Sequence, residues 1–276
     1  MSGIVIPEHF ISSGERQDAY IISYSHQEKL FRQKVSFEYY TFSLLVEGIK
    51  EIHTPSSNER IHPFNFLVVK RGNCLMTEKL SNNSTYRSKL ILFSMEFLQN
   101  FIRKYQVTIP KNEALSNELY RILPFDDYIR LYVESISSVE VSPMMQQAKV
   151  EELLIYCYEK FGGNLFSFIT EESAYPNLQQ VVEEHVSENL SIEELAFLCN
   201  MSISTFKRAF RQTYDATPSK WIKNKRLELS KTDLQDIKLR ASDVYLKYGF
   251  GSLSRYISAF KETYGITPKQ FQQSLK

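Results

Sequence analysis

Five polar side chains within eight residues have the types and spacing needed to contact the edges of DNA bases. They fall on one side of a helix of 3.6 residues per turn, whereas Phe206, Ala209, Phe210 and Thr213 fall on the other. Arg and Lys pair with guanine edges, small hydroxyls adapt to several bases, and flanking cations hold phosphates. The segment therefore predicts a helix that enters a major groove. Its outward residues are Ser204, Thr205, Lys207, Arg208 and Arg211.

The same pattern returns fifty residues later. Residues 206–218 align with residues 256–268, and two copies are too few for a solenoid, so a duplicated small module is predicted. The identical pairs are Ser202/Ser252, Ser204/Ser254, Ala209/Ala259, Phe210/Phe260, Thr213/Thr263, Tyr214/Tyr264, Thr217/Thr267 and Pro218/Pro268. In the second copy the outward residues are Leu253, Ser254, Arg255 and Ser258.

Each copy also has the signals of a helix, a turn and a second helix. A capping box at residues 191–194 opens the first helix, and a turn follows at Asn200 and Met201. Ser202 then caps the next helix, as Ser252 does in the second copy, where Gly249 supplies the turn. We expect Ser202 and Ser252 to contact phosphates as well as to cap.

A helix is predicted between the copies, from Ser219 to Leu234, and Lys225 on it is a candidate phosphate contact. At 1.5 Å per residue it spans about 24 Å. A linker helix of this length would place two recognition helices in successive major grooves, which lie about 34 Å apart along one face of the duplex.

Positive charge is concentrated in this part of the chain. The whole protein of 276 residues carries a net charge of only +1. From Ile203 onward, however, fifteen Lys and Arg residues stand against six Asp and Glu residues. Clustered cations matter more for phosphate binding than the total does, so the distribution favours double-stranded DNA as a partner.

Residues 178–272 resemble the DNA-binding part of the AraC/XylS family of bacterial transcription regulators. The most specific part is Tyr248-Gly249-Phe250, then Ser252, Phe260-Lys261 and residues 264–268. The resemblance implies base contacts by Ser204, Lys207 and Arg208 and by the four outward residues of the second copy. It also implies a transcription activator that works with RNA polymerase. Three positions depart from the family pattern: Asn200, Arg240 and Tyr245.

The amino-terminal half has a different hydrophobic pattern, which predicts short strands followed by helices. Strands are predicted at residues 19–25, 39–46, 49–53, 64–69, 75–80 and 90–93, and helices at 95–105, 128–138 and 144–161. This half resembles the family's cupin-type regulatory domain with dimerisation helices. The fold class is therefore α+β with two domains. Residues 1–170 form a cupin-like barrel or sandwich with helices, and residues 174–276 an all-α domain of two helix-turn-helix units joined by a linker helix.

Control through the amino-terminal domain is left open between a small molecule and a partner protein. Apolar residues of two strands are expected to face the barrel interior and fill it: Phe42, Leu44, Val46, Phe66 and Val68. The apolar stripe of the helix at 144–161 favours packing on its own barrel, with a homodimer as the secondary expectation.

An enzyme is the main alternative, because some DNA-repair alkyltransferases carry a similar DNA-binding unit. The three cysteines, Cys74, Cys157 and Cys199, form no transfer motif, and the five histidines have no metal-ligand spacing. We therefore expect no enzymatic activity, metal or cofactor. With no apolar run of about 20 residues and no secretory signal, we expect a cytoplasmic protein without a membrane partner.

Overall fold

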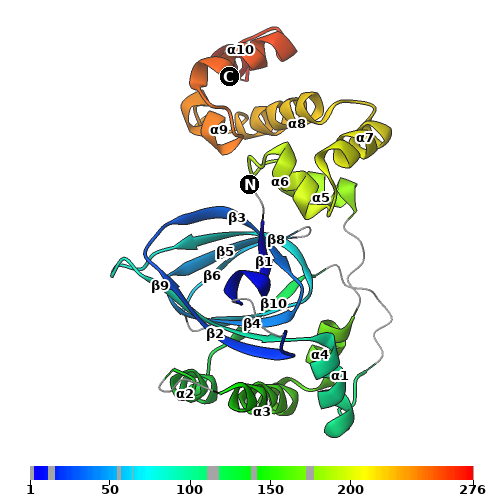
Figure 1. Cartoon of the computed structure of the whole chain (residues 1–276). Coiled ribbons are helices and arrows are strands. Elements are labelled where there is room, and N and C mark those ends of the chain that lie inside the picture. Colours follow the sequence, from blue (N-terminus) through cyan, green and yellow to red (C-terminus); the bar gives the residue numbers. More distant parts are fainter. Residues whose placement is uncertain are drawn as a thin grey trace. The chain divides into compact units, whose positions relative to one another are not determined.

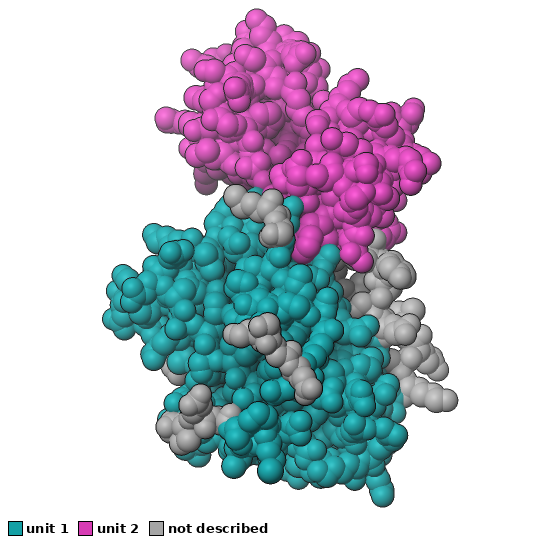
Figure 2. Space-filling model, viewed as in Figure 1, with its two compact units in different colours: residues 1–175 teal, residues 176–276 magenta. Residues whose placement is uncertain are grey.

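The computed structural model describes residues 3–11, 16–54, 57–63, 65–110, 118–137, 142–171 and 177–275. The chain divides into two units, residues 1–175 (unit 1) and residues 176–276 (unit 2), coloured separately in Figure 2. All of the described strands belong to unit 1, and unit 2 is helical. The α+β, two-domain prediction is confirmed. Of residues 171–173, which separate the two predicted domains, only Glu171 lies within the described residues.

Unit 1 is built from two five-stranded sheets that face one another (Figure 1). The strand order is β1-β3-β8-β5-β6 in the first sheet and β10-β7-β4-β9-β2 in the second, which agrees with the cupin-like barrel that the resemblance implied. The strands are β1 (Ile4–Ile6), β2 (Ala19–His26), β3 (Leu30–Phe37), β4 (Tyr40–Glu47), β5 (Ile49–Thr54), β6 (Ser57–Ile61), β7 (Asn65–Val69), β8 (Gly72–Lys79), β9 (Tyr86–Phe93) and β10 (Tyr120–Pro124). A 3₁₀ turn, η1 (Glu8–Phe10), follows β1.

The second sheet is buried on both faces, and this overturns one expectation. Phe42, Leu44, Phe66 and Val68 belong to the apolar cluster that includes Leu153 of a covering helix, so they face away from the barrel interior. The interior is lined instead by the residues that alternate with them, among them Leu45, Leu67 and Val69. When both faces of a strand are buried, apolar side chains stand on both, and the sequence does not show which face lines the barrel interior.

Four helices follow the strands in unit 1: α1 (Met95–Lys104), α2 (Asp127–Ser135), α3 (Pro143–Phe161) and α4 (Gly163–Thr170). Ser94, Asp126 and Ser142 each accept a hydrogen bond from the first turn of the helix that they cap. Figure 1 shows α3 against the outer face of the second sheet. The predicted stripe of α3 is buried at Val150, Leu153, Leu154 and Cys157, in the core of its own unit.

Unit 2 consists of helices α5 to α11 within the described residues. They are α5 (Leu178–His185), α6 (Ile192–Leu198), α7 (Ile203–Tyr214), α8 (Pro218–Asp233), α9 (Ala241–Lys247), α10 (Leu253–Tyr264) and α11 (Pro268–Gln273). The capping box of Ser191 and Glu194 opens α6. Although Arg240 occupies the capping position of α9, the Asp243 carboxylate accepts a 2.8 Å hydrogen bond from Arg240 N and closes the first turn. The two helix-turn-helix units and their linker helix are as predicted.

No helix in the described part of the chain combines the length and apolarity that a membrane span requires.

Candidate nucleic-acid interface

The first recognition face lies on α7, whose orientation is fixed by buried aromatic rings. Phe206 and Phe210 are completely buried, with ring centroids 5.7 Å apart, and Phe210 also contacts Trp221 of α8 at 5.8 Å. Because these rings point into the core, the other side of the helix is held outward. The side chains on that side are exposed: Ser204, Thr205, Lys207, Arg208 and Arg211.

Hydroxyl groups cluster at the amino-terminal end of α7. Ser202 Oγ accepts a 3.2 Å hydrogen bond from Thr205 N and lies 2.8 Å from Thr205 Oγ1 and 3.0 Å from Ser204 Oγ. Each hydroxyl donates and accepts, so this exposed group can pair with either kind of base edge or with a phosphate.

One residue of α7 differs from its predicted position. Thr213 was expected on the buried side, but it is exposed and its hydroxyl donates a 3.1 Å hydrogen bond to Ala209 O. This local bond satisfies the hydroxyl without burying the side chain.

The second recognition face lies on α10. Tyr256, Ala259 and Phe260 are buried, and Ser252 caps the helix by accepting a 3.3 Å hydrogen bond from Arg255 N. The side chains of Ser254, Arg255 and Ser258 are exposed. Leu253 is half-buried and packs against the core of the second helix-turn-helix unit, so only part of it is available to a base.

The linker helix α8 is tied to both helix-turn-helix units. Arg226 donates hydrogen bonds to Val186 O at 2.7 Å and to Leu190 O at 3.3 Å, both before α6. On the other side Lys223 Nζ pairs with Glu262 of α10 at 3.2 Å. Lys225, the predicted phosphate contact, is half-buried and pairs with Glu228 at 3.0 Å on α8 itself.

A cleft of about 780 Å³ runs along α8 inside unit 2. Its walls include Ser254, Arg255 and Ser258 of α10, Lys223 of α8, and Ser191 at the start of α6. Lys223 and Ser191 were not among the residues predicted from the sequence to contact DNA, although Lys223 stands among the cationic residues of α8. Glu262 also lines the cleft and opposes an anion there.

The interior of unit 1 is polar at one place and has little free space. Glu78 accepts hydrogen bonds from Tyr24 OH and pairs with His26 Nε2, both at 2.9 Å, and Lys50 Nζ lies 3.8 Å from the same carboxylate. Lys50 Nζ also donates to Ser43 Oγ at 2.9 Å. Burial lowers the pKa of Lys50, and the Glu78 charge partly offsets this effect. The adjoining cavity of about 40 Å³ has room for about three water molecules.

The thiol groups have the properties of core residues. Cys74, Cys157 and Cys199 are buried and unpaired, and burial raises the pKa of Cys74 and of Cys199 to about 12. A nucleophilic thiol needs a lowered pKa and access to its substrate, which these residues lack.

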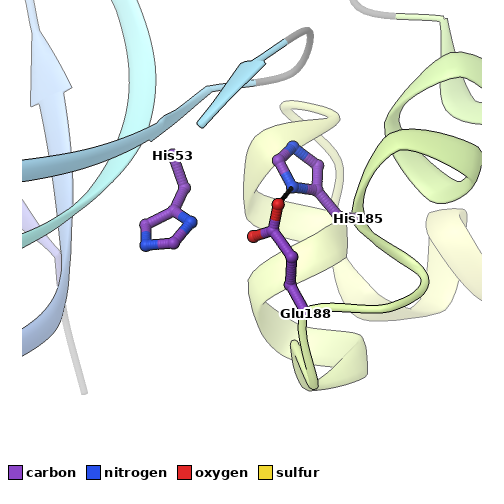
Figure 3. Close-up of side chains that lie close together, drawn as sticks. All are labelled: His53, His185 and Glu188. Carbon is purple, nitrogen blue, oxygen red and sulfur yellow. Dashed lines mark ion pairs between the residues drawn. The ribbon is translucent and has the colours of Figure 1, made fainter. Parts of the chain in front are cut away.

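Of the histidines, the buried His185 of α5 lies with its Nδ1 3.1 Å from Glu188 Oε1, three residues along the chain (Figure 3). The contact ties the end of α5 to the loop that leads to α6, so it has a structural explanation within unit 2.

Two family profiles match different parts of the chain. The profile described as "Helix-turn-helix domain" matches residues 195–274, and the one described as "ExsA N-terminal regulatory domain" matches residues 40–169. Both recognition helices lie within the first match.

Among curated proteins, the HTH-type transcriptional regulator ExsA of Pseudomonas aeruginosa is 24% identical over 238 residues, covering 83% of this chain and 84% of that protein. The virulence regulon transcriptional activator VirF of Yersinia enterocolitica is 28% identical over 130 residues, covering 46% of this chain and 48% of its own length. Among solved structures, apo ToxT from Vibrio cholerae strain SCE256 is 13% identical, covering 95% of this chain and 99% of that one, with a TM-score of 0.45.

Proposed function

The chain belongs to the AraC/XylS family of bacterial transcription regulators, and from this premise we propose that it is an activator that reads two adjacent major grooves of double-stranded DNA. RNA polymerase is the partner that it would recruit, and unit 1 is the part that would receive the controlling signal.

One observation carries the proposal: α7 and α10 have the same division into a buried aromatic side and an exposed polar side. Phe206 and Phe210 are repeated by Tyr256 and Phe260, all completely buried. In Figure 1 the two helices lie at opposite ends of α8, whose 16 residues span about 24 Å. Successive major grooves are about 34 Å apart, so the width of the helices themselves or a bend in the duplex would make up the difference.

The exposed side chains divide by chemistry into two roles. Lys207, Arg208 and Arg255 are suited to guanine edges, and Ser204, Thr205, Ser254 and Ser258 to several bases. Arg211, Ser202 and Ser252 are suited to phosphates at the groove edges. We do not assign Lys225 to DNA while it is paired with Glu228.

The experiment begins with selection of bound sequences from random DNA by the full chain. Arg208→Ala should then weaken binding to the selected site by about 1–3 kcal/mol and relax base choice at one position. Arg103→Ala is the matched control, because Arg103 is an exposed arginine of α1 in unit 1. Unchanged affinity and unchanged base choice for Arg208→Ala would contradict the assignment of α7.

Activation needs a separate measurement. Purified chain, RNA polymerase and a template carrying the selected site should give more transcript than the same mixture without the chain. Fewer transcripts would make the protein a repressor and would leave its DNA reading intact.

The signal received by unit 1 is proposed to be contact with a protein. A cavity of about 40 Å³ is far below the 300–1,000 Å³ usual for small-molecule sites, and the polar groups beside it already pair with one another. Native mass spectrometry of the purified chain should therefore give the mass of one polypeptide, or of two for a dimer, with no added small molecule. A retained small molecule would favour the ligand alternative.

A second copy of the chain is proposed to dock on α2 and α3, which lie side by side in Figure 1. Large apolar side chains are exposed there: Leu131 at 62%, Met144 at 80% and Met145 at 52%. Such exposure on a folded surface is typical of an interface. Leu131→Glu should convert a dimer to a monomer in sedimentation analysis, and a wild-type monomer would rule the dimer out.

A further inference from the structure

A close contact joins the two helix-turn-helix units within unit 2. Gly249, in the turn before α10, has a φ of +72°, and a Cβ built there would lie 2.1 Å from Asn189 Oδ1 and 2.3 Å from Asn189 Cγ. Cβ atoms essentially never come within 3.0 Å of another residue's atoms. The asparagine side chain thus occupies the space that any larger residue at position 249 would need.

Backbone geometry alone does not account for this glycine. The matching turn of the first helix-turn-helix unit contains Asn200, which has a φ of 55°. The turns share their hydrogen bonds, since Asn200 N donates to Phe197 O at 3.0 Å and Gly249 N donates to Leu246 O at 3.1 Å. Asparagine therefore adopts this left-handed backbone conformation in the first copy. In the other copy, the approach of Asn189 supplies the additional reason for a residue without a side chain.

Asn189 is itself held in place from the linker helix. The Arg226 guanidinium reaches Asn189 Oδ1 at 3.4 Å, in addition to its bonds to Val186 O and Leu190 O. The loop before α6, the linker helix and the turn before α10 consequently meet around a single side chain.

We propose that the Asn189–Gly249 contact sets the separation of α7 and α10, and hence the number of base pairs between the two sequences that they read. The junction is connected to both recognition helices, because α10 begins at Leu253 and the loop of Asn189 leads into α6, the helix that precedes α7. A Cβ at position 249 would also lie 2.8 Å from Asn189 Cβ, so rotating the asparagine amide away would not fully relieve the contact. The loop of Asn189 or the turn of Gly249 would therefore have to shift as well, and the two helix-turn-helix units with it. Asn189 and Gly249 are then positioning residues for the proposed two-groove reading.

Three variants of the full chain separate this role from backbone strain. Gly249→Asn keeps a residue that the matching turn accepts, yet adds the side chain that collides with Asn189. Asn189→Gly removes the collision partner at a φ of 56°, which glycine adopts freely. The double variant therefore restores space at the junction while keeping Asn at position 249.

The first measurement is the distance between spin labels at exposed positions Gln212 of α7 and Lys261 of α10, introduced as cysteines; the three natural cysteines are buried. Wild-type protein should give a single, narrow distribution of distances between the two labels. Gly249→Asn should shift or broaden it, and the double variant should restore it. Because no DNA is involved, an unchanged distance in Gly249→Asn overturns the inference whether or not the proposed function holds.

The second measurement uses the selected DNA site, variants of it with one base pair inserted or removed between its two halves, and duplexes carrying one half only. Gly249→Asn should bind the natural spacing at least tenfold more weakly while half-site affinity changes less than twofold. Asn189→Gly, which adds no bulk, should lower the preference for the natural spacing at least fivefold, and this result decides the matter if Gly249→Asn does not fold. Equal losses on whole and half sites, or unchanged spacing preference in Asn189→Gly, would overturn the inference. A wild-type chain that selects no two-part sequence would instead refute the proposed function.

Discussion

The hydroxyl of Tyr256 in α10 donates a 3.1 Å hydrogen bond to Ser230 Oγ of α8, and both side chains are completely buried. Ser230 Oγ in turn donates to Leu227 O at 2.7 Å. The linker helix and the second recognition helix are thus joined by a short hydrogen-bonded chain inside the core. Burial raises the pKa of Tyr256 to about 12, so the phenol stays protonated as a donor at neutral pH.

Tyr256→Phe should lower the free energy of unfolding by about 1 kcal/mol, because Ser230 loses its donor while keeping its own acceptor. The affinity of folded protein for selected DNA should not change. Urea denaturation measures the first quantity and fluorescence anisotropy the second. Tyr245→Phe is the control, since the structure gives the Tyr245 hydroxyl no hydrogen bond within the described residues. A loss no larger than in that control would contradict the role of the buried bond.

Glu262→Gln should raise DNA affinity by about two- to fivefold at low salt, since it removes the anion that lines the cleft and pairs with Lys223. Lys223 would then be free to meet a phosphate, so the logarithmic salt dependence should steepen by about one unit. Titration at several salt concentrations checks both effects. Glu228→Gln, which releases Lys225 on the same helix, provides a comparison. A weaker Glu262→Gln complex would indicate that the ion pair is needed to orient α10.

The acid stability of unit 1 should depend on Asp126. Burial of this carboxyl opposes ionisation, but hydrogen bonds from Lys160, Tyr156 and Ile129 N outweigh it and lower the pKa to about 2. The unfolded value is about 3.9. Because the folded pKa is the lower one, the stabilisation is complete above about pH 4 and disappears as the pH falls towards 2.

Asp126→Asn should therefore flatten the loss of thermal stability between pH 4 and pH 2. It should also lower the melting temperature at pH 7, although Asn still caps α2. Asp127→Asn changes the same formal charge at the neighbouring exposed position and serves as the control. Identical acid profiles for Asp126→Asn and wild type would refute this explanation.

The thiols should be almost unreactive in the folded chain. With a pKa of about 12, Cys74 and Cys199 are ionised about a thousandfold less at pH 8 than a free thiol, before any effect of burial on access. A chromogenic disulfide reagent should modify them slowly under native conditions and at once in guanidinium. Rapid native modification, or transfer of a methyl group from alkylated DNA to any cysteine, would revive the alkyltransferase alternative.

The elements that could be predicted from the sequence are those with strong local signals. The capping box at Ser191 and the repeat of aromatic residues predict α6, α7 and α10 because they specify a helix start and a buried face within a few residues. The strand β3 was missed. Its residues Arg32 to Lys34 are polar, Arg32 has a φ of 48°, and the pairing with β8 shifts register there, so no alternation survives.

Contacts between distant residues could not be predicted in this way. The exposure of the five polar residues predicted on the outward side of α7 follows from helical periodicity, and each of the five is exposed as expected. The pairing of Lys223 with Glu262 and the approach of Asn189 to Gly249 depend on how separate helices pack, which no local pattern records. The face of β4 that lines the barrel was misassigned for the same reason.

The turn of the second helix-turn-helix unit is one residue longer than the turn of the first helix-turn-helix unit. Met201 alone separates Asn200 from the cap of α7, whereas Phe250 and Gly251 both separate Gly249 from the cap of α10. One residue corresponds to about 100° around a helix. Matching the two copies from their turns would therefore align Lys207 and Arg211 of α7 with the buried Tyr256 and Phe260 of α10. Exchange of segments between the copies will preserve the groove-facing sides only if the joins are counted from the serine caps.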